Sequence, residues 1–130
     1  MRVADVSAHV LVKVDKSVSL REAAIELCGN EVGVLAAEDS HGVTGIFSER
    51  DLARAVADEA DIDVVQVREY MTESPVSVDQ EAPVEEAIGL MHRFGVRHVI
   101  VAHKGELSGL ISARDVLRML APDVAQITQG

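Results

Sequence analysis

The sequence predicts an α/β (α+β) fold in which two pseudo-symmetric β-α-β-β-α repeats pack sheet to sheet as one domain. When the chain is shifted by 64 positions, so that Gly45 meets Gly109 (109 − 45 = 64), thirteen of the 55 aligned positions from 3 to 57 are identical. Chance would give about four identities. The length of 130 residues and the hydrophobic fraction of 48% suit one compact core. Because one such unit cannot bury its sheet alone, the two copies are expected to share that core.

Each repeat is expected to open with an extended segment and a helix. β-branched residues recur at a spacing of two in residues 10–14 and again in residues 76–78, which is typical of a strand. Apolar residues at helical spacing then predict a helix from Leu20 to Gly29 in the first repeat and from Val84 to Phe94 in the second.

The ends of these two helices carry local signals. Ser19 and Glu22 have the spacing of a capping box, whereas Pro83 occupies the position of Ser19 in the second repeat, which leaves that start open by a residue or two. Gly29 and Gly95 suit the helix exits, because glycine adopts the left-handed conformation that often ends a helix.

Two strands and a last helix complete each repeat. The strands are expected at residues 32–37 and 43–47 in the first repeat, and at residues 96–101 and 107–111 in the second. Turns rich in Gly, Asp and Ser or Lys separate them, at residues 39–42 and 103–106.

The last helix is expected to begin at Ser48 or Ser112 and to end near Asp58 or Pro122. Residues 58–66 then form an acidic connector. This organisation divides the chain into residues 1–66, the first repeat with its connector, and residues 67–130, the second repeat with a C-terminal tail.

Composition excludes some classes of partner. The net charge of −10 repels phosphate backbones, so nucleic-acid binding is not expected. No apolar run approaches the roughly 20 residues needed to cross a bilayer, so no membrane partner is expected either. Cys28 is the single cysteine, which fits a reducing compartment and predicts a cytoplasmic protein. This cysteine is expected to be packed or half-exposed on its helix.

Metal and catalytic sites are not indicated by the spacing of the reactive side chains. His92, His98 and His103 are six and five positions apart, which matches no compact metal pattern, so these side chains are expected to be solvated or hydrogen-bonded. No P-loop, no Gly-x-Gly-x-x-Gly and no spacing typical of a Ser-His-Asp set is present. The sequence therefore favours a binding protein without a resident cofactor over an enzyme.

The sharpest signal is a segment repeated in both copies, Gly45-Ile46-Phe47-Ser48-Glu49-Arg50-Asp51 and Gly109-Leu110-Ile111-Ser112-Ala113-Arg114-Asp115. One interpretation is structural, because Ser at a helix N-cap with an acid three residues later caps the helix. The other is functional. The N–H groups at a helix start can hold phosphate, the acid can accept two ribose hydroxyls and the arginine can neutralise phosphate charge. Capping alone does not require the repeated glycine or arginine, and the two interpretations stay open.

With these segments in place, the chain resembles a stand-alone CBS-domain pair, or Bateman module. The resemblance rests on both Gly-x-x-Ser-x-x-Asp segments and on the junction Val67-Arg68-Glu69-Tyr70-Met71-Thr72-Glu73-Ser74-Pro75-Val76, and it covers residues 3 to 121. It implies a non-catalytic regulatory or sensor module that binds AMP, ADP, ATP or S-adenosylmethionine in clefts between the two repeats. The alternative is a ligand-free dimerisation or protein-interaction module that regulates a separate enzyme or transporter.

The resemblance also implies which residues line the two clefts. One cleft would use Ser112, Arg114 and Asp115 with Val18, Val32 and Gly33, and the other would use Ser48, Arg50 and Asp51 with Ala82, Val96 and Arg97. Since Arg97-His98 stands where the first repeat has Gly33-Val34, the Asp51 cleft is expected to favour the more phosphorylated ligand. A homodimer is implied by analogy with the family.

Overall fold

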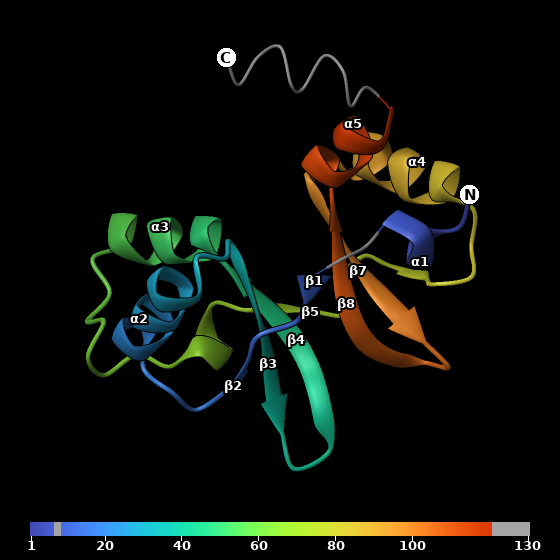
Figure 1. The fold of residues 1–130 in the computed structure, drawn as a ribbon. Helices are drawn as coiled ribbons and strands as arrows, with labels where there is room; N and C mark the ends of the chain where they lie inside the picture. The colour runs from blue at the N-terminus through green and yellow to red at the C-terminus, as the bar shows by residue number, and fades with distance from the viewer. Residues whose placement is uncertain (7–8, 121–130) are drawn as a thin grey trace. The chain divides into compact units, whose positions relative to one another are not determined.

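The computed structural model describes residues 1–6 and 9–120, and it divides into two compact units. The first, here called the repeat-1 unit, is Leu11–Pro75. The second, the repeat-2 unit, combines the described residues of 1–10 with residues 76–120. Each unit holds a four-stranded mixed sheet with helices beside it, so the α/β class is confirmed (Figure 1).

The repeat-1 unit follows the predicted β-α-β-β-α order. Its sheet runs in the order β2-β3-β4-β5, with β2 parallel to β3 and the other neighbours antiparallel. The strands are β2 (Lys13–Asp15), β3 (Val34–Asp39), β4 (Gly42–Ser48) and β5 (Thr72–Glu73). The helices are α2 (Leu20–Asn30), α3 (Glu49–Ala57) and the short 3-10 helix η1 (Val67–Glu69).

The repeat-2 unit repeats this plan. Its sheet runs in the order β1-β8-β7-β6, again with one parallel pair, β6 and β7. The strands are β1 (His9–Val10), β6 (Ser77–Asp79), β7 (His98–His103) and β8 (Glu106–Ser112), and the helices are α1 (Val3–Val6), α4 (Val84–Phe94) and α5 (Ala113–Leu120). The predicted end of the last helix near Pro122 lies outside the described residues.

One predicted strand is wrong, because residues 10–14 belong to two different sheets. His9 and Val10 pair with Leu110 and Gly109 of β8, whereas Lys13–Asp15 pair in parallel with β3. In the repeat-1 unit the edge position beside β4 is taken by β5, from the junction between the repeats. The compact units therefore do not follow the expected division between residues 66 and 67.

The first residues of each repeat pack on the other repeat. Val3 is fully buried in the core of the repeat-2 unit, and its N–H donates to the Ala82 carbonyl at 2.8 Å. Val67, its partner in the self-alignment, is fully buried in the repeat-1 unit and donates to the Val18 carbonyl at 2.9 Å. The identity of these two valines thus reflects two equivalent packing positions.

The helix starts are confirmed, but one helix exit is not. Ser19 caps α2 and accepts a hydrogen bond from the Glu22 N–H, and α4 begins directly after Pro83. Gly95 ends α4 in the left-handed conformation (φ 63°), as expected. In the first repeat, however, α2 runs through Gly29, and the left-handed residue is Glu31 (φ 54°), which is the residue aligned with Gly95.

The strands after α2 and α4 begin two residues later than predicted. Val32 and Val96 still belong to the helix exits, because their N–H groups donate to the carbonyls of Leu27 and Met91, both at 3.1 Å. These residues have the β-branched side chains of a strand, yet the closing turn of the helix holds their backbone. Cys28, on the last turn of α2, is exposed rather than packed or half-exposed.

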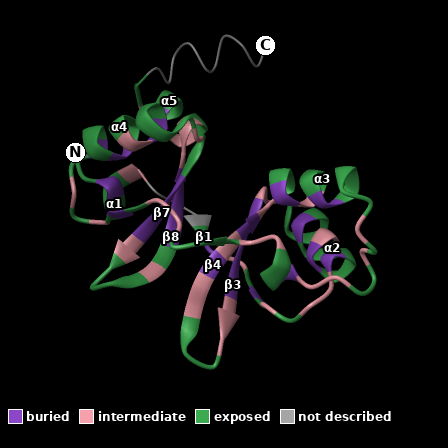
Figure 2. Ribbon diagram, turned by 180° about the vertical axis from the view of Figure 1, so that it is seen from behind, coloured by how far each residue is buried: buried purple, intermediate pink, exposed green. Residues whose placement is uncertain are grey.

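The cores lie between the helices and one face of each sheet. In the repeat-1 unit the largest fully buried side chains are Phe47, Leu20 and Leu35, and in the repeat-2 unit they include Ile111 and Val99. Some residues on the other face of each sheet are buried as well, and Figure 2 shows buried residues along the strands. This other face carries Val34, Ala36, Ile100 and Leu110. Sheet-to-sheet packing of the two repeats stays a prediction.

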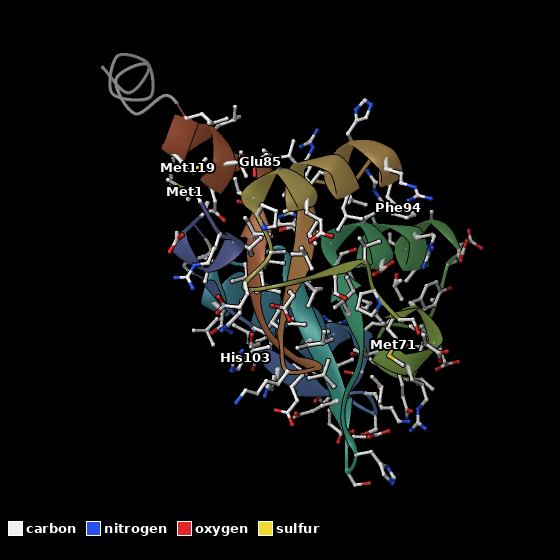
Figure 3. The ribbon with its side chains drawn as sticks, turned by 90° about the vertical axis from the view of Figure 1, so that its right-hand side faces the viewer. Met1, Met71, Glu85, Phe94, His103 and Met119 are labelled. Carbon is white, nitrogen blue, oxygen red and sulfur yellow. The ribbon has the colours of Figure 1, made fainter. Side chains whose placement is uncertain are left out.

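Parts of the helices are exposed (Figure 2), and several large apolar side chains of the helices lie in solvent. Ile25 of α2, Val56 of α3 and Leu117 and Leu120 of α5 are all more than half exposed. Phe94, at the end of α4, is 52% exposed and lies beside the Arg93 guanidinium (Figure 3). Within the described residues, no helix combines the length and hydropathy that a bilayer crossing requires.

Candidate ligand-binding site

The repeated motif of the first copy sits where β4 passes into α3. Ser48 is the last residue of β4 and the N-cap of α3, and Asp51 is the third residue of the helix. The Asp51 Oδ2 accepts hydrogen bonds from the Ser48 N–H at 2.9 Å and from the Ser48 hydroxyl at 3.0 Å. The Ser48 Oγ in turn accepts from the Asp51 N–H at 3.2 Å. The capping interpretation is thereby confirmed for this copy, and it leaves Asp51 only 6% exposed.

The second copy has the same reciprocal bonds. The Ser112 N–H donates to the Asp115 Oδ2 at 2.9 Å, and the Asp115 N–H donates to the Ser112 Oγ at 3.1 Å. Both carboxylates lie at the start of a helix, where the unpaired N–H groups and the helix dipole favour negative charge. The predicted ligand binding would use the same carboxylates, so the capping contacts do not exclude it.

The repeated glycine has a structural role that the sequence did not reveal. A Cβ on Gly45 would lie 2.6 Å from the Thr72 carbonyl oxygen and 3.2 Å from the Met71 sulfur, both on the junction (Met71 is labelled in Figure 3). Gly109 stands opposite Val10 of β1 in the same register position. Gly45 therefore admits the edge strand β5, which accounts for this glycine without a ligand.

The predicted residues before β3 and β7 lie beside the motif of their own repeat. The Gly33 carbonyl accepts from the Glu49 N–H at 3.0 Å, and the Arg97 carbonyl accepts from the Ala113 N–H at 2.8 Å. Val32 and Val96, which precede Gly33 and Arg97, are half-buried. In each unit a half-buried valine thus directly precedes a residue that is hydrogen-bonded to the first residue of the motif helix. The expected combinations across the two repeats stay predictions.

The remaining predicted site residues are two turn residues and the two arginines of the motifs. Val18 and Ala82 are half-buried in the turns that precede α2 and α4, and their carbonyls accept from Val67 and Val3. Arg50 and Arg114 are exposed on the first turn of their helices. Their side chains are therefore accessible to solvent beside the motif.

The two motifs differ in local charge. In the first repeat, the Glu49 carboxylate lies 3.7 Å from the position that a Cβ on Gly33 would take. In the second repeat the aligned residues are Ala113 and Arg97. An acid and a glycine in the first repeat therefore correspond to an alanine and an arginine in the second, so the aligned positions beside the two motifs differ in charge.

Arg54 and Tyr70 form further contacts around Asp51 that were not predicted from the sequence. The Arg54 Nη2 donates to the Asp51 Oδ1 at 3.2 Å and to the Tyr70 carbonyl at 3.1 Å. The Arg54 guanidinium lies 5.8 Å from the centre of the Tyr70 ring. The Tyr70 hydroxyl donates to the Asp58 Oδ2 at 3.0 Å, which raises the pKa of Tyr70. The one available signal was the four-residue spacing of Arg50 and Arg54.

Metal ligation finds no support in the part of the chain that the structure describes. No three His, Cys, Asp or Glu side chains among the described residues come close enough together to hold a metal ion. A shallow open hollow lies between β2 and α2, and its wall includes Val18, Glu22 and Glu26. Of the predicted site residues only Val18 contributes to it, so it is separate from the Ser-Asp motifs.

Comparisons with known proteins agree with this arrangement. The model of the CBS domain matches residues 67–122. An uncharacterised 17.7 kDa protein of Acidianus ambivalens is 35% identical over 121 residues, which are 92% of this chain and 73% of that protein. The chain also matches the arabinose 5-phosphate isomerase of Escherichia coli, of which it spans only 32%.

Solved structures match over nearly the whole chain. A CBS domain protein from Pyrobaculum aerophilum, solved in complex with AMP, is 33% identical with a TM-score of 0.82, and the match covers 97% of this chain and 99% of that one. A CBS domain pair in complex with 5'-methylthioadenosine and S-adenosyl-L-methionine has a TM-score of 0.82 at 22% identity, covering 94% and 97% of the two chains. The two repeats, the two motifs and these matches show that the chain belongs to the CBS-domain family as a tandem CBS pair.

Proposed function

We propose that this chain is a non-catalytic regulatory module that binds an adenosine-containing ligand, such as AMP, ADP, ATP or S-adenosylmethionine, at its Ser-x-x-Asp motifs. The observation that carries the proposal is the buried carboxylate of Asp51, with that of Asp115 at the equivalent place, at the start of a helix. The AMP complex of the Pyrobaculum aerophilum relative supports the ligand class.

The chemistry around each motif suits the parts of such a ligand. A carboxylate offers about four acceptor positions, so it can accept both hydroxyls of a ribose diol. The helix start and the exposed arginine at position 50 or 114 suit a phosphate. The half-buried valines at positions 32 and 96 offer apolar contact for a base.

Calorimetric titration with AMP, ATP and S-adenosylmethionine tests the proposal. Asp115→Ala and Asp51→Ala each remove an ionised acceptor, which costs about 1.5–3 kcal/mol or roughly 10- to 150-fold in affinity at the motif concerned. Ser19→Ala is the matched control, because it removes a helix cap of similar strength on α2, away from the motifs. Absence of binding heat with all three compounds overturns the proposal.

The second candidate is a protein-interaction module, and the exposed apolar side chains of the helices favour it. Leu117 and Leu120 of α5 are each 65% exposed. Such side chains suit association with a second copy or with a regulated enzyme or transporter. We expect Leu117→Glu to lower the sedimentation-equilibrium mass from that of a dimer to that of a monomer. A wild-type protein that sediments as a monomer would contradict the homodimer.

A further inference from the structure

The carboxylate of Asp51 is already partly occupied within its own repeat. Its Oδ2 accepts two hydrogen bonds from Ser48, and its Oδ1 accepts one from Arg54. Of about four acceptor positions on a carboxylate, three are used. A ribose diol brings two O–H donors, so Asp51 can accept both only if one of its present donors leaves.

The three present donors differ in how readily they can leave. The Ser48 N–H is fixed in the backbone at the start of α3, and the Ser48 hydroxyl is held by the Asp51 N–H at 3.2 Å. Arg54 has a side chain that is 59% exposed, so its guanidinium can return to water at little cost. The incoming diol therefore displaces Arg54 rather than Ser48.

Arg54 also holds the junction between the repeats. Its Nη2 donates to the Tyr70 carbonyl at 3.1 Å with the same nitrogen that donates to Asp51. Two residues further on, Thr72 begins β5, which pairs with β4 at Gly45 and Ile46. The chain then passes to the repeat-2 unit at Val76. Through Tyr70, Arg54 thus contacts the segment that connects the two units.

We infer that Arg54 is a positioning residue that couples diol binding at Asp51 to the junction at Tyr70. A bound diol takes the acceptor position of Arg54 on the Asp51 Oδ1, the guanidinium moves away, and the Tyr70 carbonyl loses its donor. This coupling rests on the proposed function. It gives the Asp51 motif an output, a loosened junction, that the Asp115 motif does not share, since the junction residues lie in the repeat-1 unit.

The chain offers a direct reporter of this event. Tyr70 is the single tyrosine of the sequence, so a protein grown with 3-fluorotyrosine gives one ¹⁹F resonance from the junction. AMP is expected to shift this resonance in the wild type. In Arg54→Gln the Tyr70 carbonyl already lacks the Arg54 donor, so AMP leaves the resonance in place and binds about two- to five-fold more tightly, because no ion pair has to break.

Two comparisons isolate the mechanism. 2'-Deoxy-AMP brings one ribose O–H to Asp51 in place of two, fills the one vacant acceptor position and gains nothing from Arg54→Gln. Asp58→Asn weakens the hydrogen bond that the Tyr70 hydroxyl donates to residue 58 and leaves the contacts of Asp51 unchanged, so the AMP affinity of this variant equals that of the wild type. Arg118→Gln, at the aligned position of the second repeat, keeps the wild-type response of the Tyr70 resonance.

The outcomes separate the coupling from the proposed function. If AMP binds while Arg54→Gln keeps wild-type affinity, or while the Tyr70 resonance stays still in the wild type, the coupling is wrong and the ligand-binding function stands. If neither AMP, ATP nor S-adenosylmethionine gives any binding heat, both fall. Urea denaturation of Arg54→Gln and of the charge-retaining variant Arg54→Lys tests whether a folding defect accounts for the altered affinity.

Discussion

At the scale of single residues, the repeated motif turns out to serve several purposes at once. Ser48 and Asp51 cap a helix, and the same carboxylate is the proposed ligand acceptor. Gly45, which the sequence suggested as part of the functional signal, has a steric role instead. A residue that recurs in both copies can therefore recur because both copies need it for packing.

The steric role of Gly45 can be tested by adding one carbon. In Gly45→Ala the new Cβ would stand 2.6 Å from the Thr72 carbonyl oxygen, a backbone atom that cannot turn away, so we expect a loss of about 1–3 kcal/mol in the free energy of unfolding. Gly89→Ala is the control, because Gly89 lies inside α4 with open space around it and should gain about 0.5–1 kcal/mol. Urea denaturation measures both. Equal stability of the wild type and Gly45→Ala would contradict the steric account.

At the scale of helices and strands, features set by local sequence signals were predicted best, and strand pairing between distant segments was predicted least well. The start of α2 was readable because the cap at Ser19 and its partner Glu22 lie within one short stretch of sequence. The delayed start of β3 could not be predicted in this way, because Val32 has a β-branched side chain typical of strands, while its N–H bonds to the Leu27 carbonyl at the helix exit. Residues 10–14 look continuous, and nothing in their own pattern says that the two ends pair with different sheets.

The same limit applies to the candidate site. The motif residues could be found because they recur at a fixed shift, whereas the contact of Arg54 with Tyr70 joins residues 16 positions apart through the return of the junction to α3. Such a contact has no periodic signature. Val56 of α3 and Leu120 of α5 are apolar yet exposed, whereas Ala55 and Val116 of the same helices are buried.

A charged contact ties α2 to the connector, and its contribution depends on pH. The Arg21 guanidinium donates two hydrogen bonds to the Asp63 carboxylate, which lowers the pKa of Asp63. A carboxyl with a lowered folded-state pKa stabilises the fold above its unfolded pKa, roughly 3.9, and that contribution disappears as the pH falls through the folded-state pKa.

Asp63→Asn should therefore be less stable than the wild type at pH 7 and equal to it in strong acid. Thermal unfolding from pH 7 down to about pH 2 measures the difference. Both side chains are exposed, so the difference at pH 7 should also shrink in high salt. A deficit that persists unchanged in acid would show that the substitution disturbs the connector by some route other than charge. Glu59→Gln, on the same connector, serves as the control for removing one negative charge.

At the scale of the whole molecule, the two compact units do not coincide with the two sequence repeats. Each unit is completed by a short segment from the start of the opposite repeat: residues 1–6 with β1 for the repeat-2 unit, and Val67–Glu69 with β5 for the repeat-1 unit. The exchange makes each sheet four strands wide and gives each core one fully buried valine. A repeat cut out at the sequence boundary would lose both.

This exchange of segments predicts which unit each core mutation destabilises. Val3→Ala removes a fully buried side chain and should cost about 2 kcal/mol of the free energy of unfolding, as should Val67→Ala. Hydrogen exchange followed by mass spectrometry then separates the two. Val3→Ala should lower amide protection in β6, β7 and β8, far away along the chain, because the Val3 N–H and side chain contact that unit. Val67→Ala should instead lower protection in β2, β3 and β4, which all precede it in the chain. If Val3→Ala loosened β3 and β4 and left β7 and β8 protected, residues 1–6 would belong to the repeat that follows them, and the exchange of segments would be wrong.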